Sequence, residues 1–398
     1  MSAIEFDISR VSKDHDSELA ALRWLRENDP VHWDERHNWW LITRHQDLKD
    51  VSRQPHLFSS ELNGAWISID SRFSIQAQDG PAHDRTRKTV SRGFTARSTA
   101  HLEQRVLEFA DAAIDAVAAA GRCDVVADIA RPVPLRVVAE LLDIEGHDLF
   151  SRWTEAVEHM ISGYHADAEG DAKASEEFEA YIRRIVAVRT ANPGTDLIST
   201  MIKGRGDGVF DAFERDTLPG VPKGDGVMGF ISFLVIAGSE TTRNALSIGV
   251  QALMNHPDQL QRLRADPSLI KSATEEILRV SAPARTMMRT VVTDTELGGR
   301  AMKAGDRVVL CYESANYDEQ VFENSEQFRI DRSPNDHVSF GFGSHFCLGA
   351  NLARVEIRAM FSEVLSRLHD MELAGPVERL RSNFINGPRH MPVRFRAH

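Results

Sequence analysis

The sequence predicts a mainly α fold with small β-sheets (α+β), arranged as a single domain over residues 1–398. The first observation is the stretch 224–255, whose first half is apolar on every face and therefore predicts a long helix through the interior. At 1.5 Å per residue this helix would be on the order of 45 Å long. Helical patterns also outweigh strand patterns elsewhere, and no Gly/Ser-rich or Pro-rich linker, low-complexity run or internal repeat divides the chain.

The composition excludes several classes of protein. With 42% hydrophobic and 27% charged residues the chain has ample core material, and its formal net charge of −12 argues against a nucleic-acid partner. Cys123, Cys311 and Cys347 lie far apart without CxxC spacing, so neither a disulfide framework nor a zinc site is expected. Because we find neither a signal-peptide pattern nor an apolar run long enough to span a bilayer, the sequence predicts a soluble, cytoplasmic protein without a membrane anchor.

The first 80 residues predict a helix at 17–27, a hairpin of strands 31–33 and 39–43, and a further helix near Gln46. Residues 59–80 predict a loop. This loop carries more large apolar side chains than a solvated loop needs, namely Trp66, Ile67, Ile69, Phe73 and Ile75. Either it packs back on the core or it lines an apolar pocket, and the sequence leaves both interpretations open.

Helices dominate the middle of the chain. They are expected at 98–119, 128–142, 147–163 and 171–191, with a short strand at 123–126, and the last two helices form an αα-hairpin. Residues 192–223 are rich in Gly, Pro and Asp and predict a connector. Beyond the long helix we expect a short helix after Pro257, strands at about 289–297 and 306–311, and a long coil leading to residue 340.

Residues 340–349, F-G-F-G-S-H-F-C-L-G, place Cys347 in a glycine-punctuated loop immediately before a helix. Gly341 and Gly343 permit backbone conformations and close approaches that a β-carbon would forbid. The apolar stripe from Leu348 onward predicts a helix that opens just after the cysteine, and the N–H groups at its start favour a thiolate over a thiol. A lone cysteine is usually an inert buried residue, so the signal lies in the whole stretch.

The middle of the long helix carries a second unusual group, A-G-S-E-T-T. Gly238 is flanked by residues that compete for backbone hydrogen bonds, which predicts a local distortion. Glu240 and Thr241 place a carboxyl and a hydroxyl side by side in a buried helix, and an unpaired buried carboxylate is costly enough to indicate a functional site. The alternative is structural, with Glu240 in a salt bridge and Thr241 bonded back to the helix.

The stretch 340–349 resembles the heme-binding signature of the cytochrome P450 family, and further matching elements are spread along nearly the whole chain. The resemblance implies the cytochrome P450 fold, with the long central helix over a heme b cofactor. It makes Cys347 the axial ligand of the iron, a position from which a thiolate promotes O–O cleavage. The residues it assigns to cofactor binding are His83, Arg87, Ala237, Arg289, Phe340, Gly341, His345, Cys347 and Gly349.

Within that set, His83 and Arg87 lie four residues apart and so on one face of the helix that Pro81 introduces. The resemblance makes these two residues, together with Arg289 and His345, candidates for holding the heme propionates. It also makes the i,i+3 pair Glu276 and Arg279 a buried structural pair tied to the cysteine loop. The usual third member of that group is an arginine near Gln327, so Arg329 and Arg332 are both candidates here.

The resemblance implies a monooxygenase with the reaction R–H + O2 + two electrons + two protons to R–OH + water, in which Glu240 and Thr241 deliver protons. Electrons would come from an iron–sulfur ferredoxin and its NAD(P)H-dependent reductase, because this chain contains no flavin or NAD(P)-binding segment. The enzyme is expected to be a monomer that binds the ferredoxin at Arg85, Lys88, Arg92 and Arg354. A peroxide-driven peroxygenase and a non-catalytic heme sensor are the alternatives, and neither needs an acid–alcohol pair.

The substrate is expected to be a hydrophobic small molecule such as a steroid, terpenoid or lipid. The candidate pocket residues are almost all apolar: Trp66, Ile69, Phe73, Ile236, Ala237, Ala282, Met287, Met288, Phe384 and Ile385. Arg285 is close enough in sequence to leave a fatty-acid carboxylate clamp open. By resemblance, the αα-hairpin 147–191 forms the lid of the substrate channel, and the region from Arg289 to Gly349 is most similar to bacterial members that hydroxylate sterol side chains and branched or terpenoid lipids.

Overall fold

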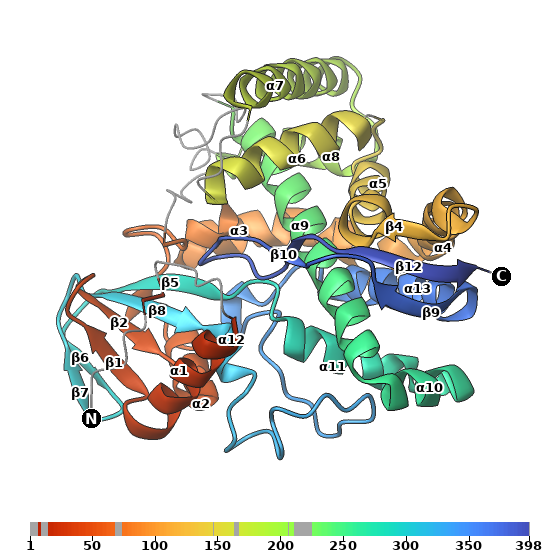
Figure 1. Cartoon of the computed structure of the whole chain (residues 1–398). Helices are drawn as coiled ribbons and strands as arrows, with labels where there is room; N and C mark the ends of the chain where they lie inside the picture. Colours follow the sequence, from red (N-terminus) through yellow and green to blue (C-terminus); the bar gives the residue numbers. More distant parts are fainter. Residues whose placement is uncertain are drawn as a thin grey trace. The chain divides into compact units, whose positions relative to one another are not determined.

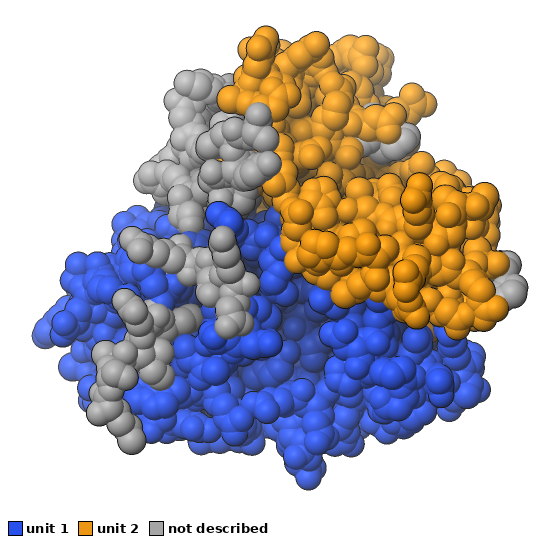
Figure 2. All heavy atoms as spheres, viewed as in Figure 1, with its two compact units in different colours: residues 1–70, 248–347, 379–387 blue, residues 71–247, 348–378, 388–398 orange. Residues whose placement is uncertain are grey.

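The computed structural model describes residues 7–8, 15–67, 74–145, 147–162, 167–205, 207–210 and 225–397 (Figure 1). The chain divides into two compact units, which Figure 2 shows in blue and orange. Unit 1 contains residues 1–70, 248–347 and 379–387, and unit 2 contains residues 71–247, 348–378 and 388–398. Each unit is built from separate segments, so the division does not follow the order of the chain, and a single domain over residues 1–398 stays a prediction.

Unit 1 is organised around a five-stranded sheet with the strand order β1-β2-β8-β5-β3. Its strands are β1 (Val31–Asp34), β2 (Trp39–Ile42), β3 (Phe58–Ser59), β5 (Thr286–Val291) and β8 (Arg307–Cys311). β1 and β2 form the expected antiparallel hairpin, whereas β8 joins β2 in parallel. The strand expected at 289–297 is wrong in its bounds: the chain bends at 292–294, so β5 ends before the bend and β6 (Thr295–Leu297) pairs separately with β7 (Arg300–Met302).

Both faces of this sheet are buried, as the alternation along β2 shows. Trp40 and Ile42 belong to one apolar cluster, and Trp39 and Leu41 belong to another. This follows because successive side chains of a strand point to opposite faces of its sheet. Cys311 of β8 packs in the second cluster, where burial raises the pKa of its thiol to about 12, so it is a core residue.

The helices of unit 1 are α1 (His15–Asn28), α2 (His45–Ser52), α10 (Pro257–Ala265), α11 (Ile270–Ser281) and α12 (Tyr312–Ala315), with short 3₁₀ turns at η5 (Pro267–Leu269) and η6 (Gly343–His345). The four-residue helix α12 contacts α1, α2 and β5, and Figure 1 shows α1, α2 and α12 beside the sheet. α12 therefore joins the N-terminal helices to the strands that follow α11.

Unit 2 is mainly helical. Its helices are α3 (Gly80–Ser91), α4 (Ala96–Ala118), α5 (Pro132–Leu141), α6 (His147–Ser162), α7 (Ala168–Ala191), α8 (Leu197–Arg205) and α13 (Ala350–Arg367), with short 3₁₀ turns at η1 (Ile75–Ala77) and η2 (Arg92–Phe94). α4 packs along α13, and α6 packs along α7 as the expected αα-hairpin. The small sheets are β4 (Arg122–Asp124), β12 (Pro392–Ala397) and β9 (Leu368–Leu373), in that order, and the pair β10 (Glu378–Arg379) and β11 (Pro388–His390).

Two expectations for unit 2 are corrected. The helix expected at 128–142 is split into a π-helical segment (η3, Val125–Ala130) and α5, because the Asp124 side chain accepts hydrogen bonds from the first amides of η3 and Pro132 begins a new helix. The stretch 192–223 is not only a connector, since α8 begins after Asp196, whose carboxylate accepts the amide of Ser199 at 2.9 Å. Burial of Leu197, Ile198 and Met201 holds α8 in place.

The long helix is confirmed as α9 (Gly226–Asn255). Its residues are buried on all sides through most of the N-terminal half, as an all-round apolar pattern requires. α9 is assigned as α-helix from Gly226 to Asn255 without an interruption at Gly238. Gly238 also allows a close approach of α5, because a β-carbon there would lie 2.7 Å from Cγ2 of Val138. In the part of the chain that the structure describes, no helix is long and apolar enough to cross a membrane.

Candidate functional site

The loop that carries Cys347 is closed by its own backbone. The amide of Cys347 donates to the carbonyl of Phe340 at 2.8 Å, and the amide of Gly341 donates to Val338 at 2.8 Å. Both Gly341 and Gly343 have a φ of +72°, a left-handed conformation that residues with a β-carbon rarely adopt. A β-carbon at Gly343 would also lie 2.5 Å from the carbonyl oxygen of Ser52, so glycine is required twice over at this position.

Helix α2 holds this loop from one side. The ring of Phe342 lies 4.7 Å from both Lys49 Nζ and the guanidinium carbon of Arg53, which is cation–π geometry. Lys49 also donates to the carboxylate of Asp336 at 2.7 Å, just before the loop. The loop position is therefore set by tertiary contacts with α2 as well as by its glycines.

Of the three cysteines, only Cys347 is exposed. Burial raises the pKa of the Cys123 and Cys311 thiols to about 12, which keeps both as thiols. A β-carbon placed at Gly349 would meet no atom within 4 Å, so this position leaves open space beside the start of α13, which begins at Ala350. An exposed cysteine two residues before a glycine that meets no neighbouring atom fits a position that could hold a heme iron.

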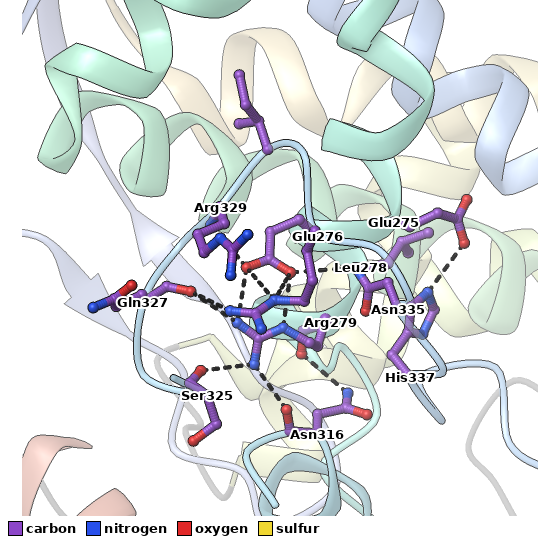
Figure 3. Close-up of polar contacts among 12 residues, drawn as sticks. Glu275, Glu276, Leu278, Arg279, Asn316, Ser325, Gln327, Arg329, Asn335 and His337 are labelled. Atoms are coloured by element: carbon purple, nitrogen blue, oxygen red, sulfur yellow. Dashed lines mark hydrogen bonds and ion pairs between the residues drawn. The ribbon is translucent and has the colours of Figure 1, made fainter. Parts of the chain in front are cut away.

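The buried pair Glu276 and Arg279 ties α11 to the coil before the cysteine loop (Figure 3). Both side chains are fully buried, and Arg279 donates to both carboxylate oxygens of Glu276, at 2.8 and 2.9 Å. Arg332 provides the third member, with Nε 3.0 Å from the Glu276 carboxylate, whereas Arg329 contributes its backbone amide at 2.9 Å. The question that the sequence left open is thus answered in favour of the Arg332 side chain.

Electrostatics explain why this carboxylate stays charged. Burial alone would raise the pKa of Glu276, but the hydrogen bond and charge of Arg279, the Arg329 amide and the charge of Arg332 outweigh it and hold the pKa below its ordinary value. Asn316 extends the network toward the cysteine loop, since its side chain accepts from the Val338 amide and donates to Ser339, at 2.8 and 2.7 Å. The network is structural, and it fixes the chain that leads to Phe340.

Glu240 and Thr241 of α9 make the contacts that the structural alternative predicted, namely an ion pair and a hydrogen bond back to the helix. Thr241 Oγ1 donates to the carbonyl of Ala237 at 2.8 Å, and Glu240 Oε2 lies 2.7 Å from Arg243 Nη2 as an ion pair. Arg243 in turn donates to Glu158 of α6 at 2.6 Å. All three charged side chains are buried, so two carboxylates share one guanidinium inside unit 2.

The two carboxylates are not equivalent. Burial raises the pKa of Glu240, and the opposing charge of Arg243 does not overcome that effect. Burial acts in the same direction on Glu158, but Arg243 and Arg131 together bring its pKa below the ordinary value. Glu158 is therefore the carboxylate that stays ionised, and Glu240 is the one that holds a proton more readily.

The candidate propionate ligands lie in both units. In unit 1, Arg289 is buried on β5, and Nε2 of His345 lies 3.2 Å from the hydroxyl of Ser60. In unit 2, His83 and Arg87 belong to the same helix, α3, and burial lowers the pKa of His83. Each of these side chains can donate a hydrogen bond, as a ligand of an anionic propionate must.

The candidate pocket residues lie in several places in the two units. Trp66 and Phe384 are stacked, with ring centroids 4.4 Å apart, so the 59–67 part of the loop packs back on unit 1. Met287 packs against the core of the sheet, while Met288 accepts from Arg307 Nε at 3.1 Å. The remaining described members are Ala282 and Ile385 in unit 1 and Ile236 and Ala237 in unit 2, and Ile69 and Phe73 lie outside the described residues.

Sequence reasoning missed the charged partners of Glu240 and of Arg285. Arg243 could have been predicted from the sequence as the partner of Glu240, because it lies at i+3, the same spacing that identified the pair Glu276 and Arg279. Glu158 could not have been predicted, because it is 85 residues away from Arg243 on another helix. Glu18 lies 267 residues from Arg285, and no local pattern links the two.

The chain belongs to the cytochrome P450 family. The family model described as Cytochrome P450 matches residues 189–373. The steroid C26-monooxygenase of Mycobacterium tuberculosis strain H37Rv is 39% identical over 94% of this chain and 93% of its own length, and the linalool 8-monooxygenase of Pseudomonas putida is 33% identical over 93% of each. A Mycobacterium marinum cytochrome P450 solved in complex with pseudoionone covers 99% of this chain and 100% of its own, with 30% identity and a TM-score of 0.84. These matches confirm the predicted fold class, the heme-thiolate cofactor and monooxygenase activity.

Proposed function

We propose that this monooxygenase hydroxylates an uncharged steroid, terpenoid or similar lipid. The observation that carries the proposal is the state of Arg285, which the sequence left open as a carboxylate clamp. Its guanidinium is buried and donates to Glu18 and Glu313 at 2.7 Å each, so a fatty-acid carboxylate would have to displace one of these partners. Similarity to steroid C26- and linalool 8-monooxygenases supports the same class of substrate.

We assign the heme to the residues that the sequence indicated. Cys347 would hold the iron, and Phe340, Gly341, Ala237 and Gly349 would lie next to the ring; a β-carbon at Gly349 would meet no atom within 4 Å. His83, Arg87, Arg289 and His345 would hold the propionates. Bound there, the heme supplies the activation of oxygen, which no amino-acid side chain provides.

Protons are delivered by Glu240 and Thr241 in this proposal. The raised pKa of Glu240 suits a group that binds and releases a proton. The Thr241 hydroxyl donates its hydrogen bond to the Ala237 carbonyl, so the lone pairs of its oxygen remain to accept a hydrogen bond. Arg243 connects Glu240 to Glu158, and thereby links α9 to α6 within unit 2. A peroxygenase or a heme sensor would not need such a pair.

Electrons come from an iron–sulfur ferredoxin and its reductase. Arg85, Lys88 and Arg92 are exposed in unit 2, in a protein whose formal net charge is −12. With Arg354, these residues are the proposed docking site for an acidic partner. The rate of reduction by a ferredoxin should therefore fall as ionic strength rises, because exposed charges are screened by salt.

Ligand-induced spin-state shifts test the substrate class. The ferric protein is titrated with testosterone, linalool, laurate and a small aromatic acid while the Soret band is recorded. Displacement of water from the iron by the steroid or the terpenoid should produce the low-spin to high-spin shift, and laurate should produce little. A tight shift with the aromatic acid, and none with testosterone or linalool, would refute the proposal.

A further inference from the structure

Arg285 occupies the centre of a buried charge cluster in unit 1. Its Nε donates to Glu313 of α12 and its Nη2 donates to Glu18 of α1, each at 2.7 Å. Burial alone would lower the pKa of Arg285, but Glu313 and Glu18 more than reverse that effect, so the group is a permanent cation. His15 also approaches both carboxylates, at 3.3 Å from Glu313 and 3.6 Å from Glu18.

The segment that contains Arg285 is hydrogen-bonded to the turn that carries Phe384 and Ile385. The amide of Arg285 donates to the Phe384 carbonyl at 2.8 Å, and the amide of Asn386 donates back to the Pro283 carbonyl at 2.9 Å. The hydroxyl of Thr286 donates to the Asn383 carbonyl at 2.8 Å. The two stretches are thus paired side by side, with a β-bridge between Ala284 and Ile385.

Glu313 connects the charge cluster to this pairing. Its Oε2 accepts from Arg285, and its Oε1 accepts from the side-chain amide of Asn386 at 3.1 Å. The same amide group donates to the Ser281 carbonyl at 2.7 Å, at the end of α11. Arg379 completes the set by donating to the side-chain oxygen of Asn386 at 2.5 Å. One continuous chain of polar contacts therefore runs from α1 through Arg285 and α12 to the turn.

Stability alone does not account for this cluster. Removing charges from water is costly, and well-packed apolar residues often stabilise a protein as well or better. Buried charge networks do specify a single geometry, because a hydrogen-bonded guanidinium fork tolerates few arrangements. The geometry that this cluster specifies is the position of Phe384 and Ile385 relative to residues 282–286. Phe384 also stacks on Trp66, so a displaced turn would move both rings.

We propose that Arg285 is a positioning residue: clamped by Glu18 and Glu313, it fixes the Phe384–Ile385 turn and thereby determines how selectively the enzyme accepts hydrophobic substrates. The inference rests on the proposed function and on the expectation from the sequence that Phe384 and Ile385 line the substrate pocket. The guanidinium of Arg285 is already bonded to two carboxylates, so we assign it a positioning role and not a contact with the substrate.

The test compares Arg285→Lys with Arg26→Lys. Arg26 is a matched control because it is equally buried, lies on α1 with Glu18, and pairs with a carboxylate, Glu319, at 2.8 Å. Arg26 donates to Ser314 and Glu319, and neither of these bonds leads to the turn. Lysine keeps the positive charge in both variants but removes the planar guanidinium, which can donate hydrogen bonds in two directions at once. Hydrogen–deuterium exchange of the heme-loaded protein, without substrate, is measured at the amides of 284–286 and 384–386.

Arg285→Lys should raise exchange at these amides roughly tenfold, while Arg26→Lys should leave them at the wild-type rate. Arg285→Lys should also weaken the spin-state shifts with testosterone and linalool several-fold and broaden the set of products. Unchanged exchange at the turn, or an equal rise in both variants, would overturn the proposal. So would a selective loss of laurate binding with the other shifts intact, because that result identifies a carboxylate clamp.

Failure of the proposed function gives a different result. If the wild type shows no shift with testosterone or linalool, the substrate class is wrong, and the exchange comparison alone decides whether Arg285 positions the turn. If Arg285→Lys does not yield folded, heme-loaded protein, Glu18→Gln takes its place, because it removes one of the two partners and leaves Glu313. Wild-type exchange at the turn in Glu18→Gln would then overturn the proposal.

Discussion

Replacing Arg332 by Gln should destabilise the protein far more than replacing Arg329 by Gln. Arg332 is 5% exposed, lies 3.0 Å from the Glu276 carboxylate, and also donates to the carbonyls of Glu323 and Gln327 at 2.7 Å each. Removing one partner of a buried pair costs about 3–5 kcal/mol. Because Arg279 still holds Glu276 in the variant, we expect a loss near the lower value, about 3 kcal/mol.

Arg329→Gln is the matched control. Its side chain is 39% exposed and lies 3.8 Å from Asp331, so the side-chain contact contributes about 0–1 kcal/mol. The bond that Arg329 makes to Glu276 comes from its backbone amide, which the substitution retains. Heme retention and the urea midpoint, followed by the ferrous carbon monoxide spectrum, should separate the two variants. Equal losses in both would refute the assignment of Arg332.

The same network predicts a dependence on pH. The pKa of Glu276 is lower in the folded chain than its ordinary value, so its contribution to stability is complete above that ordinary value and is lost as the pH falls through the folded pKa. Arg332→Gln removes one of the charges that lower the pKa of Glu276. The acid-unfolding midpoint should therefore move to higher pH in Arg332→Gln and stay in place in Arg329→Gln.

The remaining predictions concern the proposed site. Cys347→Ser should abolish the red-shifted Soret band of the ferrous carbon monoxide complex, whereas Cys311→Ser should keep it; a histidine-type spectrum in the wild type would rule out thiolate ligation. Thr241→Ala should keep oxygen consumption but release hydrogen peroxide in place of product, and coupling at the wild-type level would exclude its role in proton delivery. Arg87→Ala combined with Arg289→Ala should loosen the heme, since each charge-assisted hydrogen bond contributes roughly 1.5–3 kcal/mol, and unchanged retention of heme after gel filtration would argue against both anchors.

Local sequence patterns were sufficient to predict those structural features whose physical cause lies within a few residues. The φ of +72° at Gly341 and Gly343 follows from glycine at those positions, and α9 follows from an apolar pattern on every face. The i,i+3 pair Glu276 and Arg279 follows from helical geometry. Each of these features depends on neighbours within a few residues, so the order of the residues contains the information.

Patterns failed where local signals were weak or mixed. The helix α8 lies in a stretch whose Gly, Pro and Asp content indicates a connector, and only burial of its apolar residues shows it to be an element of the core. The predicted strand 289–297 differs from β5 (Thr286–Val291) because β-branched residues continue past the bend at 292–294. In both cases tertiary packing overrode composition.

The sequence by itself therefore determined the fold class, the glycine-containing loop before α13 and the long helix α9. The tertiary structure decided which charges meet: Arg332 in preference to Arg329 at Glu276, Glu158 at Arg243, and Glu18 at Arg285. The physical reason is that a buried charge must find an opposite charge wherever the fold brings one, and that partner is set by the packing of helices and strands far apart in the chain.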